Sequence, residues 1–174
     1  MPHLQLNLFG QFHCALDGTV LRSFESDKVR ALLLFLAVEQ THATSRSSLA
    51  TLLWPDYGEE GARANLRQAL YQLRQVLGDE RAETPFILTS RQTIQWNPLA
   101  SCSVDVTTFR QLLNESTQHV HPRQEMCAQC LQQLEQAAEL YLGDFLAGFA
   151  VAESEGFEEW RRIQQEQLHV QAID

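Results

Sequence analysis

The sequence lacks the features that mark membrane-spanning and exported proteins. No part of its 174 residues approaches the roughly 20 consecutive apolar residues that a helix needs to cross a bilayer. The first residues, MPHLQ, contain neither the basic segment nor the apolar segment of a secretory signal. We therefore expect a cytoplasmic protein that does not act at a membrane.

The sequence also lacks the short motifs of common catalytic sites. It contains no glycine-rich phosphate loop, no nucleophile elbow and no His-Glu-x-x-His pair. One acidic run is better explained as a solvated or protein-binding face than as paired catalytic acids; it comprises Glu153, Glu155, Glu158 and Glu159. Phe157 and Trp160, which lie within this run, are expected in the core. We expect a protein that is not an enzyme.

Positive charge is scarce and unevenly distributed. The formal charge is −9, but residues 1–98 hold nine basic and ten acidic residues, whereas residues 99–174 hold four and twelve. This asymmetry predicts two units with different partners. Only one basic residue is a lysine and twelve are arginines, which favours bidentate contacts to phosphate or guanine without demonstrating them.

The first 98 residues are predicted to form a small antiparallel sheet, three helices and a β-hairpin. Alternating apolar and polar residues predict strands at 4–8 and 12–16, and Asp17-Gly18 predicts a tight turn into a return strand. The helices are expected at 28–39, 46–54 and 59–77, and the hairpin at 86–96. This order is that of a winged helix-turn-helix, so we assign residues 1–98 to a DNA-binding domain.

The remaining chain, residues 99–174, is predicted to be a helical domain. Helical patterns occupy residues 104–114 and 125–142 and continue from 157 to the end, with a glycine-punctuated connection at 143–148. The fold class is therefore α+β and mainly helical. Because the last helical pattern has no stop signal, we expect this domain to be truncated and to continue in a longer protein.

The helix at 59–77 carries most of the side chains expected to contact DNA. A stripe of leucines is expected to face the core: Leu66, Leu70, Leu73 and Leu77. The candidate DNA-binding residues lie on the rest of this helix and at the hairpin tip: Arg63, Arg67, Gln68, Tyr71, Gln72, Arg74, Gln75 and Arg91. Glutamine can pair with adenine and arginine with guanine, and the other arginines suit phosphates. A solvated helix face would have a similar composition, so the pattern alone leaves that alternative open.

Two sequence blocks resemble a known family of regulators. Residues 27–33 (DKVRALL), 52–55 (LLWP) and 64–74 (ANLRQALYQLR) resemble the antibiotic-regulatory-protein (SARP) family of bacterial activators. Residues 137–149 (AAELYLGDFLAGF), followed by Glu158-Glu159-Trp160, are similar to the bacterial transcriptional activation domain of that family. The two blocks occur in the expected order and span nearly the whole chain.

The resemblance implies an OmpR-type winged helix followed by a tetratricopeptide-like helical domain. It implies an activator that binds double-stranded promoter DNA at direct repeats, where it could form a homodimer, and that helps to recruit RNA polymerase. This chain departs from the family in its wing, where Arg91-Gln92-Thr93 replaces the common Gly-Tyr pair. That departure puts the wing's groove contact in doubt, although Arg91 could serve the same purpose.

Cysteines and histidines form a cluster that suits zinc by number. Cys127 and Cys130 form a CxxC motif, and His119 and His121 lie just upstream. Four such ligands satisfy the requirement of a tetrahedral zinc site, but the spacing is not that of a common zinc finger. A packed, inert pair or a thiol switch are the alternatives. Elsewhere, Cys14 and Cys102 are expected to be buried or loop thiols.

Two classes of function therefore follow from the sequence. In the first, the chain is a sequence-specific DNA-binding regulator with an attached helical module. In the second, it is a helical protein-interaction scaffold, possibly zinc-binding, whose winged helix does not read DNA. The near-neutral charge of residues 1–98 keeps the second class open, because release of counterions drives much of DNA affinity.

Overall fold

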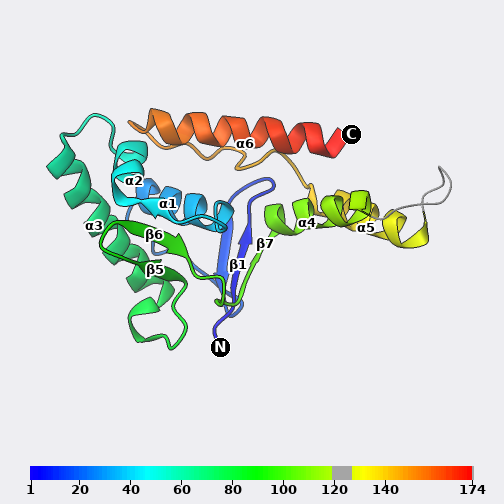
Figure 1. Cartoon of the computed structure of the whole chain (residues 1–174), viewed down its shortest axis with the longest axis horizontal. Coiled ribbons are helices and arrows are strands. Elements are labelled where there is room, and N and C mark those ends of the chain that lie inside the picture. Colours follow the sequence, from blue (N-terminus) through cyan, green and yellow to red (C-terminus); the bar gives the residue numbers. More distant parts are fainter. Residues whose placement is uncertain (119–126, 174) are drawn as a thin grey trace.

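A computed structural model describes residues 1–118 and 127–173 of the chain. Two small sheets and a set of helices surround one continuous apolar core, which includes residues from both halves of the chain. Figure 1 shows α3 at one end of the molecule, the α4–α5 pair projecting from the other, and α6 running along the top from beside α2 toward α4. No described helix is long and apolar enough to cross a membrane.

The first sheet joins the N-terminal strands to a strand from the second half of the chain. Its order is β3-β2-β1-β7, with bounds Thr19–Val20, His13–Leu16, Leu4–Asn7 and Cys102–Val104. The β1–β2 and β2–β3 pairs are antiparallel, whereas β1 and β7 are parallel. Asp17 and Gly18 both have positive φ (48° and 79°), as the predicted tight turn requires.

The winged helix-turn-helix follows this sheet. Its helices are α1 (Asp27–Val38), α2 (Arg46–Leu53) and α3 (Glu59–Leu77). The second sheet has the order β4-β6-β5, with bounds Thr44–Ser45, Thr93–Trp96 and Ile87–Thr89. Its β5–β6 hairpin is the wing, and a short 3-10 helix, η1 (Asp79–Arg81), connects α3 to it.

Local signals account for the ends of these helices. Ser26 and Ser45 cap α1 and α2, each accepting a hydrogen bond from the backbone N–H three residues on. Gly78 ends α3 in the left-handed conformation (φ 70°), and its N–H donates to the carbonyls of Arg74 and Gln75. α3 therefore has the bounds that the sequence predicted.

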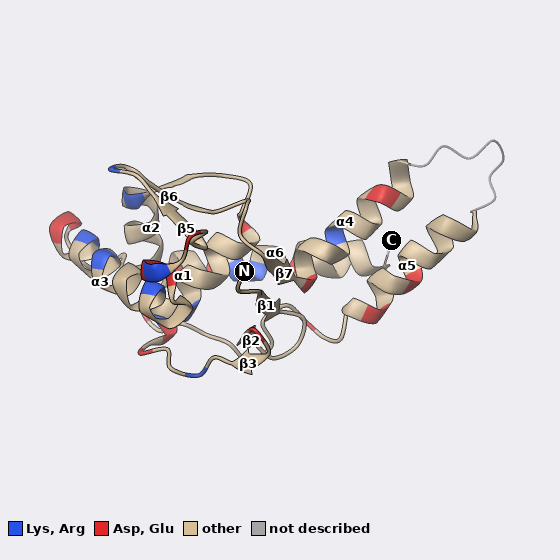
Figure 2. Ribbon diagram, turned by 90° about the horizontal axis from the view of Figure 1, so that it is seen from below, with Lys and Arg blue, Asp and Glu red and all other residues tan. Residues whose placement is uncertain are grey.

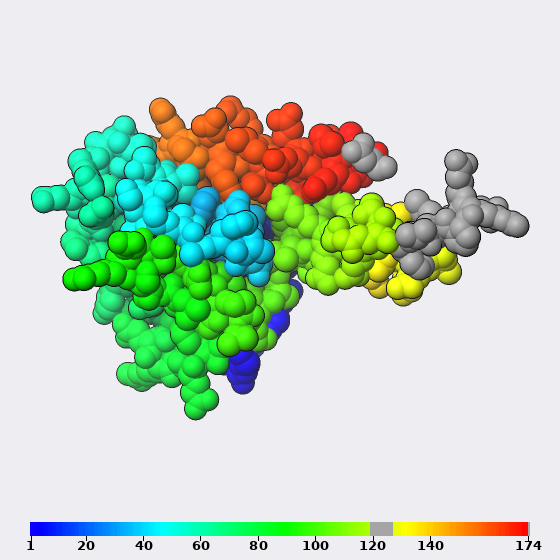
Figure 3. Space-filling model, viewed as in Figure 1, coloured from blue at the N-terminus to red at the C-terminus, as the bar shows by residue number. Residues whose placement is uncertain are grey.

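The second half is helical, as predicted, and covers the first half rather than standing apart from it. Helices α4 (Asp105–Gln118) and α5 (Ala128–Leu140) pack against each other, and Figure 3 shows this pair projecting beyond the body. Helix α6 (Glu155–Ile173) packs on α2. The two elements are close at Gly156, where an added Cβ would be in van der Waals contact with Leu52 Cδ1, at 3.4 Å.

The only lysine of the chain connects the two halves. Lys28 Nζ donates to the backbone oxygen of Leu53 at 2.8 Å and to that of Glu153 at 3.4 Å. The ammonium also lies 5.5 Å from the centre of the Trp54 ring. Burial lowers the pKa of Lys28. This cation therefore links the two halves through backbone carbonyls.

The expected winged helix and helical second half are confirmed. The predictions missed β7, because three residues give too short an alternating pattern. The division into domains 1–98 and 99–174 stays a prediction. Strand β7, which belongs to the predicted second domain, pairs with β1 of the predicted first domain. Phe157 is fully buried and Trp160 partly buried, which confirms their expected place in the core.

Candidate nucleic-acid interface

Helix α3 presents one face to the core and the other to solvent. The four predicted core leucines are all at most 6% exposed: Leu66, Leu70, Leu73 and Leu77. Five of the candidate DNA-binding residues on this helix are exposed: Arg63, Arg67, Gln68, Tyr71 and Gln75. The small Ala64 is exposed among them. The amphipathic pattern thus fixes which side chains of α3 a partner could reach.

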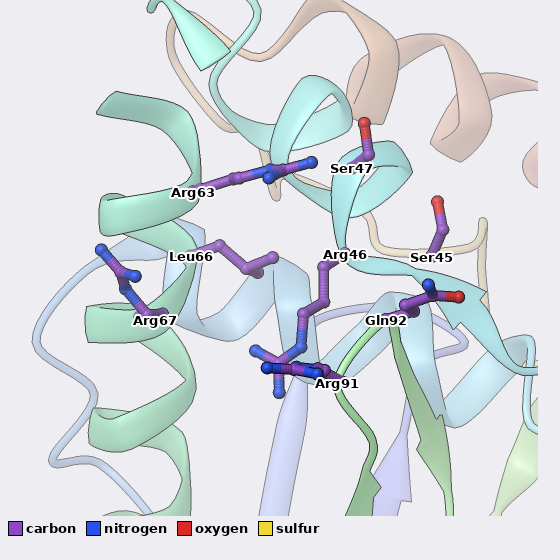
Figure 4. A pocket seen from close by; sticks show the side chains of 8 residues that line it. All are labelled: Ser45, Arg46, Ser47, Arg63, Leu66, Arg67, Arg91 and Gln92. Atoms are coloured by element: carbon purple, nitrogen blue, oxygen red, sulfur yellow. The ribbon is translucent and has the colours of Figure 1, made fainter. Parts of the chain in front are cut away.

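Arginines from three elements line a cleft beside this exposed face. The cleft has a volume of about 800 Å³ and lies between the start of α2, the N-terminal half of α3 and the tip of the wing. Figure 4 shows the side chains that line it, which are Ser45, Arg46, Ser47, Arg63, Leu66, Arg67, Arg91 and Gln92. Three of the predicted residues, Arg63, Arg67 and Arg91, are therefore brought together although the sequence separates them.

The guanidinium groups around the cleft differ in what they already contact. Arg63 pairs with Glu59 at 2.9 Å, but both side chains are largely exposed (54% and 74%), so this ion pair contributes little. Among the ion pairs of the described residues, none involves Arg67 or Arg91. These two arginines present positive charge that no described acidic residue neutralises.

Arg46 was not singled out by the sequence, and it holds the wing in place. Its Nε and Nη2 donate to the backbone oxygen of Ser90 at 3.1 and 3.0 Å. Its backbone N–H donates to the oxygen of Gln92 at 2.8 Å. A signal was present in the sequence: an arginine in the first turn of a helix faces the positive end of the helix dipole, which is unfavourable without another role.

Arg74, a predicted DNA-binding residue, is also engaged with the wing. It is half-buried, and its Nη2 donates to Ile87 O at 3.3 Å and to Thr89 Oγ1 at 3.1 Å. Its Nε is buried and has no hydrogen-bond partner among the described residues. The side chain is therefore directed to strand β5 rather than outward.

Two glutamines of α3 line a different cleft from the arginines. Gln68 and Gln72 line a second cleft of about 460 Å³, next to the start of α1 and residues 151–153. The amide nitrogen of Gln72 donates to the carboxylate of Glu25, so this amide already has an acidic partner. Tyr71 is 54% exposed and lines neither of these two clefts.

Most of the basic residues lie in the elements around α3. Figure 2 shows lysine and arginine in α1, α2, α3 and the wing, with acidic residues among them, whereas α4 and α5 carry mostly acidic residues. The exposed hydroxyls of Ser45 and Ser47 at the start of α2 add hydrogen-bonding groups beside the arginines. Positive groups and hydroxyls converging on one cleft suit an anionic polymer better than a small apolar ligand.

The predicted zinc ligands are described only in part. His119 and His121 lie outside the described residues. Cys127 is the N-cap of α5, and its Sγ lies 3.5 Å from Sγ of Cys130 in the first turn. Within residues 1–118 and 127–173, no group of three or more metal-ligating side chains comes together. The zinc site stays a prediction.

The other two cysteines lie in surroundings that keep their thiols protonated and therefore unreactive. Cys14 faces inward from β2 and is 2% exposed, and Cys102 lies on β7 and is half-buried. Burial raises the pKa of each thiol to about 12. Both therefore stay protonated at neutral pH, as expected for buried thiols.

The chain is similar in sequence to a mycobacterial regulator. Its sequence is 29% identical, over 87 residues, to the transcriptional regulatory protein EmbR of Mycobacterium bovis and of two strains of Mycobacterium tuberculosis. The match spans 50% of this chain and 22% of EmbR. No family model matches the sequence.

The fold is similar to that of a solved EmbR structure. The structure of M. tuberculosis EmbR in complex with a low-affinity phosphopeptide superimposes with a TM-score of 0.71 at 20% identity. The similarity covers 98% of this chain and 44% of the EmbR chain, so the chain spans less than half the length of that protein. The matches in sequence and in fold agree with the resemblance to SARP-type regulators that the motifs indicated, and the similarity of fold confirms a winged helix followed by a helical domain.

Proposed function

We propose that the chain is a DNA-binding transcriptional regulator that reads double-stranded DNA with α3 and holds the adjacent backbone with its wing. The observation that carries this proposal is the arginine cleft between α2, α3 and the wing tip. In helix-turn-helix proteins the second helix of the motif enters the major groove, and neighbouring elements contact phosphates. The cleft offers cationic groups where a strand beside that groove would run.

The arrangement of side chains supports distinct roles within this interface. Arg63, Arg67 and Arg91 can contact phosphates or guanine from the cleft. The exposed Gln68, Tyr71 and Gln75 can reach base edges, and the small Ala64 allows close approach. The near-neutral net charge of residues 1–98 is no obstacle, because the arginines are concentrated in one place and counterion release depends on local contacts.

The finer roles rest on the family resemblance. We propose that the DNA is a promoter containing direct repeats, that two copies bind it side by side, and that the complex activates transcription by recruiting RNA polymerase in the cytoplasm. The acidic helical half is suited to contacts with a protein rather than with nucleic acid. The same feature favours the second candidate, a protein-interaction scaffold whose winged helix does not read DNA.

Selection from a random pool of duplex DNA, followed by affinity measurement, tests the proposal. The chain should enrich a defined sequence and bind it more tightly than a scrambled duplex. Affinity for the selected duplex should fall with salt, at a slope of log K against log salt of about −0.9 for each phosphate contacted. Equal, weak binding of the selected and scrambled duplexes at low salt would favour the scaffold.

A matched pair of arginine variants locates the interface. Arg67→Ala should weaken binding of the selected duplex about tenfold, since loss of one arginine contact to a base costs about 1–3 kcal/mol. Arg162→Ala removes an equally exposed arginine from α6 and should leave affinity unchanged. Neither variant should change the thermal midpoint, because both side chains are exposed. Equal affinities of the two variants would argue against the cleft.

A further inference from the structure

The CxxC motif forms a close pair of sulfur atoms far from the arginine cleft. Cys127 caps α5 and Cys130 lies in its first turn, with their sulfur atoms 3.5 Å apart. A disulfide bond is about 2.05 Å long. Rotation of the two side chains, with a small shift of the N-cap residue, would bring the sulfurs to bonding distance. The motif that the proposed function leaves unused is thus already arranged for a covalent link.

The two thiols differ in access and in environment. Cys127 is half-buried and accepts the backbone N–H of Cys130 at 3.5 Å, at the end of the helix that stabilises negative charge. Cys130 is 1% exposed, and its Sγ lies 3.6 Å from the backbone oxygen of Ser116 on α4. A reagent from solvent therefore meets Cys127 first.

We propose that Cys127 and Cys130 are a reversible dithiol–disulfide site that peroxides oxidise. The Cys127 thiolate attacks one oxygen of the peroxide, the O–O bond breaks, and a sulfenic acid forms while the other oxygen leaves as hydroxide or alkoxide. Cys130 then attacks the Cys127 sulfur. The S–S bond forms, the S–O bond breaks, and the Cys130 proton leaves with that oxygen as water. The thiols lose two electrons and the peroxide gains them; a small dithiol restores the reduced pair.

Mass spectrometry of the whole chain tests the proposal. Protein purified without chelator is first analysed for zinc and then treated with a small excess of hydrogen peroxide, after which the intact mass should have fallen by about 2 Da. The protein is then unfolded in denaturant, so that the buried Cys14 and Cys102 are accessible, and its remaining thiols are alkylated. Two of the four cysteines should resist alkylation, and peptide mapping should place the link at 127–130. Dithiothreitol should restore all four thiols.

Matched cysteine variants identify the order of events. Cys130→Ser should stop at a sulfenic acid on Cys127 that dimedone labels, whereas a Cys14→Ser/Cys102→Ser double variant should form the link as the unchanged chain does. Four thiols still reactive after peroxide would overturn the proposal. So would about one bound zinc per chain that blocks both thiols until EDTA removes it, or oxidation of Cys127 to a sulfinic acid while Cys130 stays reduced. All three contradicting outcomes are measured on the chain without substitutions, so the test does not depend on whether a variant folds.

Discussion

Arg46 and Arg74 differ from the other arginines of the site because their side chains donate hydrogen bonds to backbone oxygens of the wing. Arg46 contacts the tip at Ser90, and Arg74 contacts strand β5 at Ile87 and Thr89. A guanidinium engaged with protein carbonyls has fewer donors left for phosphates. We infer that these two residues position the wing, while Arg67 and Arg91 are available to DNA.

Arg74→Gln separates positioning from phosphate contact. We expect it to loosen the wing, so that backbone amides of β5 and β6 exchange hydrogen faster, and to lower stability by about 1–2 kcal/mol through lost hydrogen bonds. DNA affinity should fall, with the salt slope unchanged. Arg91→Ala should instead make the slope shallower by about 0.9.

The exposed Arg81 provides the control for Arg74. Arg81→Gln removes the same charge and should leave exchange in the wing unaltered. A shallower salt slope for Arg74→Gln, with unchanged exchange, would show that this side chain contacts phosphate after all.

Asp105 joins the end of β1 to the start of α4 and makes stability depend on pH. Its Oδ2 accepts the N–H groups of Leu8 and Phe9 at 2.8 and 2.9 Å, and its Oδ1 accepts the N–H of Val106 at 2.8 Å. Burial raises the pKa of this carboxyl more than the backbone N–H groups lower it. The folded state therefore binds a proton at higher pH than the unfolded chain does.

Asp105→Asn tests this linkage. We expect a loss of about 2–4 kcal/mol, because an amide nitrogen cannot accept the N–H bonds that a carboxylate oxygen does. The pKa of this carboxyl is higher in the folded state than in the unfolded chain, where it is about 4. Its contribution to stability is therefore greatest when the pH is below the unfolded-state pKa, and it decreases as the pH rises through the folded-state pKa. The loss should thus be smaller at pH 7 than near pH 4, measured by urea unfolding. Asp56→Asn, at an exposed site, should show no such difference.

At the scale of elements, the docking of α6 on α2 depends on a small residue at position 156. A Cβ at Gly156 would be in ordinary contact with Leu52, at 3.4 Å from Cδ1 and 3.5 Å from the backbone oxygen. Gly156→Ala should therefore be tolerated. Gly156→Leu should lower the free energy of unfolding by about 1–3 kcal/mol, because its larger side chain would displace Leu52 or the helix. Thermal unfolding of the two variants measures this, and equal midpoints would show that α6 adjusts freely.

Elements with a strong local signal were predictable from sequence. The leucine stripe predicts the buried face of α3, and Gly78 predicts its C-terminal end. Asp17-Gly18 predicts the first turn. Strand β7 was missed because its only reason to be extended is pairing with β1, about a hundred residues earlier. Helix α5 begins at Ala128, so Cys127 is its cap and not part of a longer helix.

The sequence predicted which side chains of the candidate site are exposed, but not which residues they contact within the protein. Arg63, Arg67 and Arg91 are exposed, and their meeting around one cleft follows from the helix order of the fold. The partner of Gln72 is Glu25, 47 residues away, and that of Arg74 is strand β5. No periodicity within α3 reports such partners, because they depend on which distant segment packs beside the helix. The wing contacts of Arg46, on α2, depend in the same way on a segment that is distant in sequence.

At the scale of the molecule, contacts across residue 98 are dense enough to make the two halves depend on each other. The N–H of Leu4 donates to Ser101 O at 3.0 Å in the β1–β7 connection. Trp160 Nε1 donates to Glu39 at 2.9 Å, and Ser154 Oγ donates to Leu53 O at 2.7 Å. Through these bonds, a partner that moves α6 or α4 would act on α1, α2 and β1, next to the elements that we propose to bind DNA.

A comparison of fragments tests whether residues 1–98 form an independent unit. Without β7 and α4, strand β1 has an open edge, and the N–H groups of Leu8 and Phe9 lose the Asp105 carboxylate. We expect residues 1–98 to melt at least about 10 °C below the whole chain, since about 1 kcal/mol corresponds to 4–8 °C in a domain of this size. A fragment of residues 1–118, which restores β7 and α4, should recover much of the difference. If residues 1–98 instead unfold as cooperatively and at the same temperature as the whole chain, then the boundary at residue 98 separates two independent domains, and α6 and α4 have no mechanical route to the DNA-binding helix.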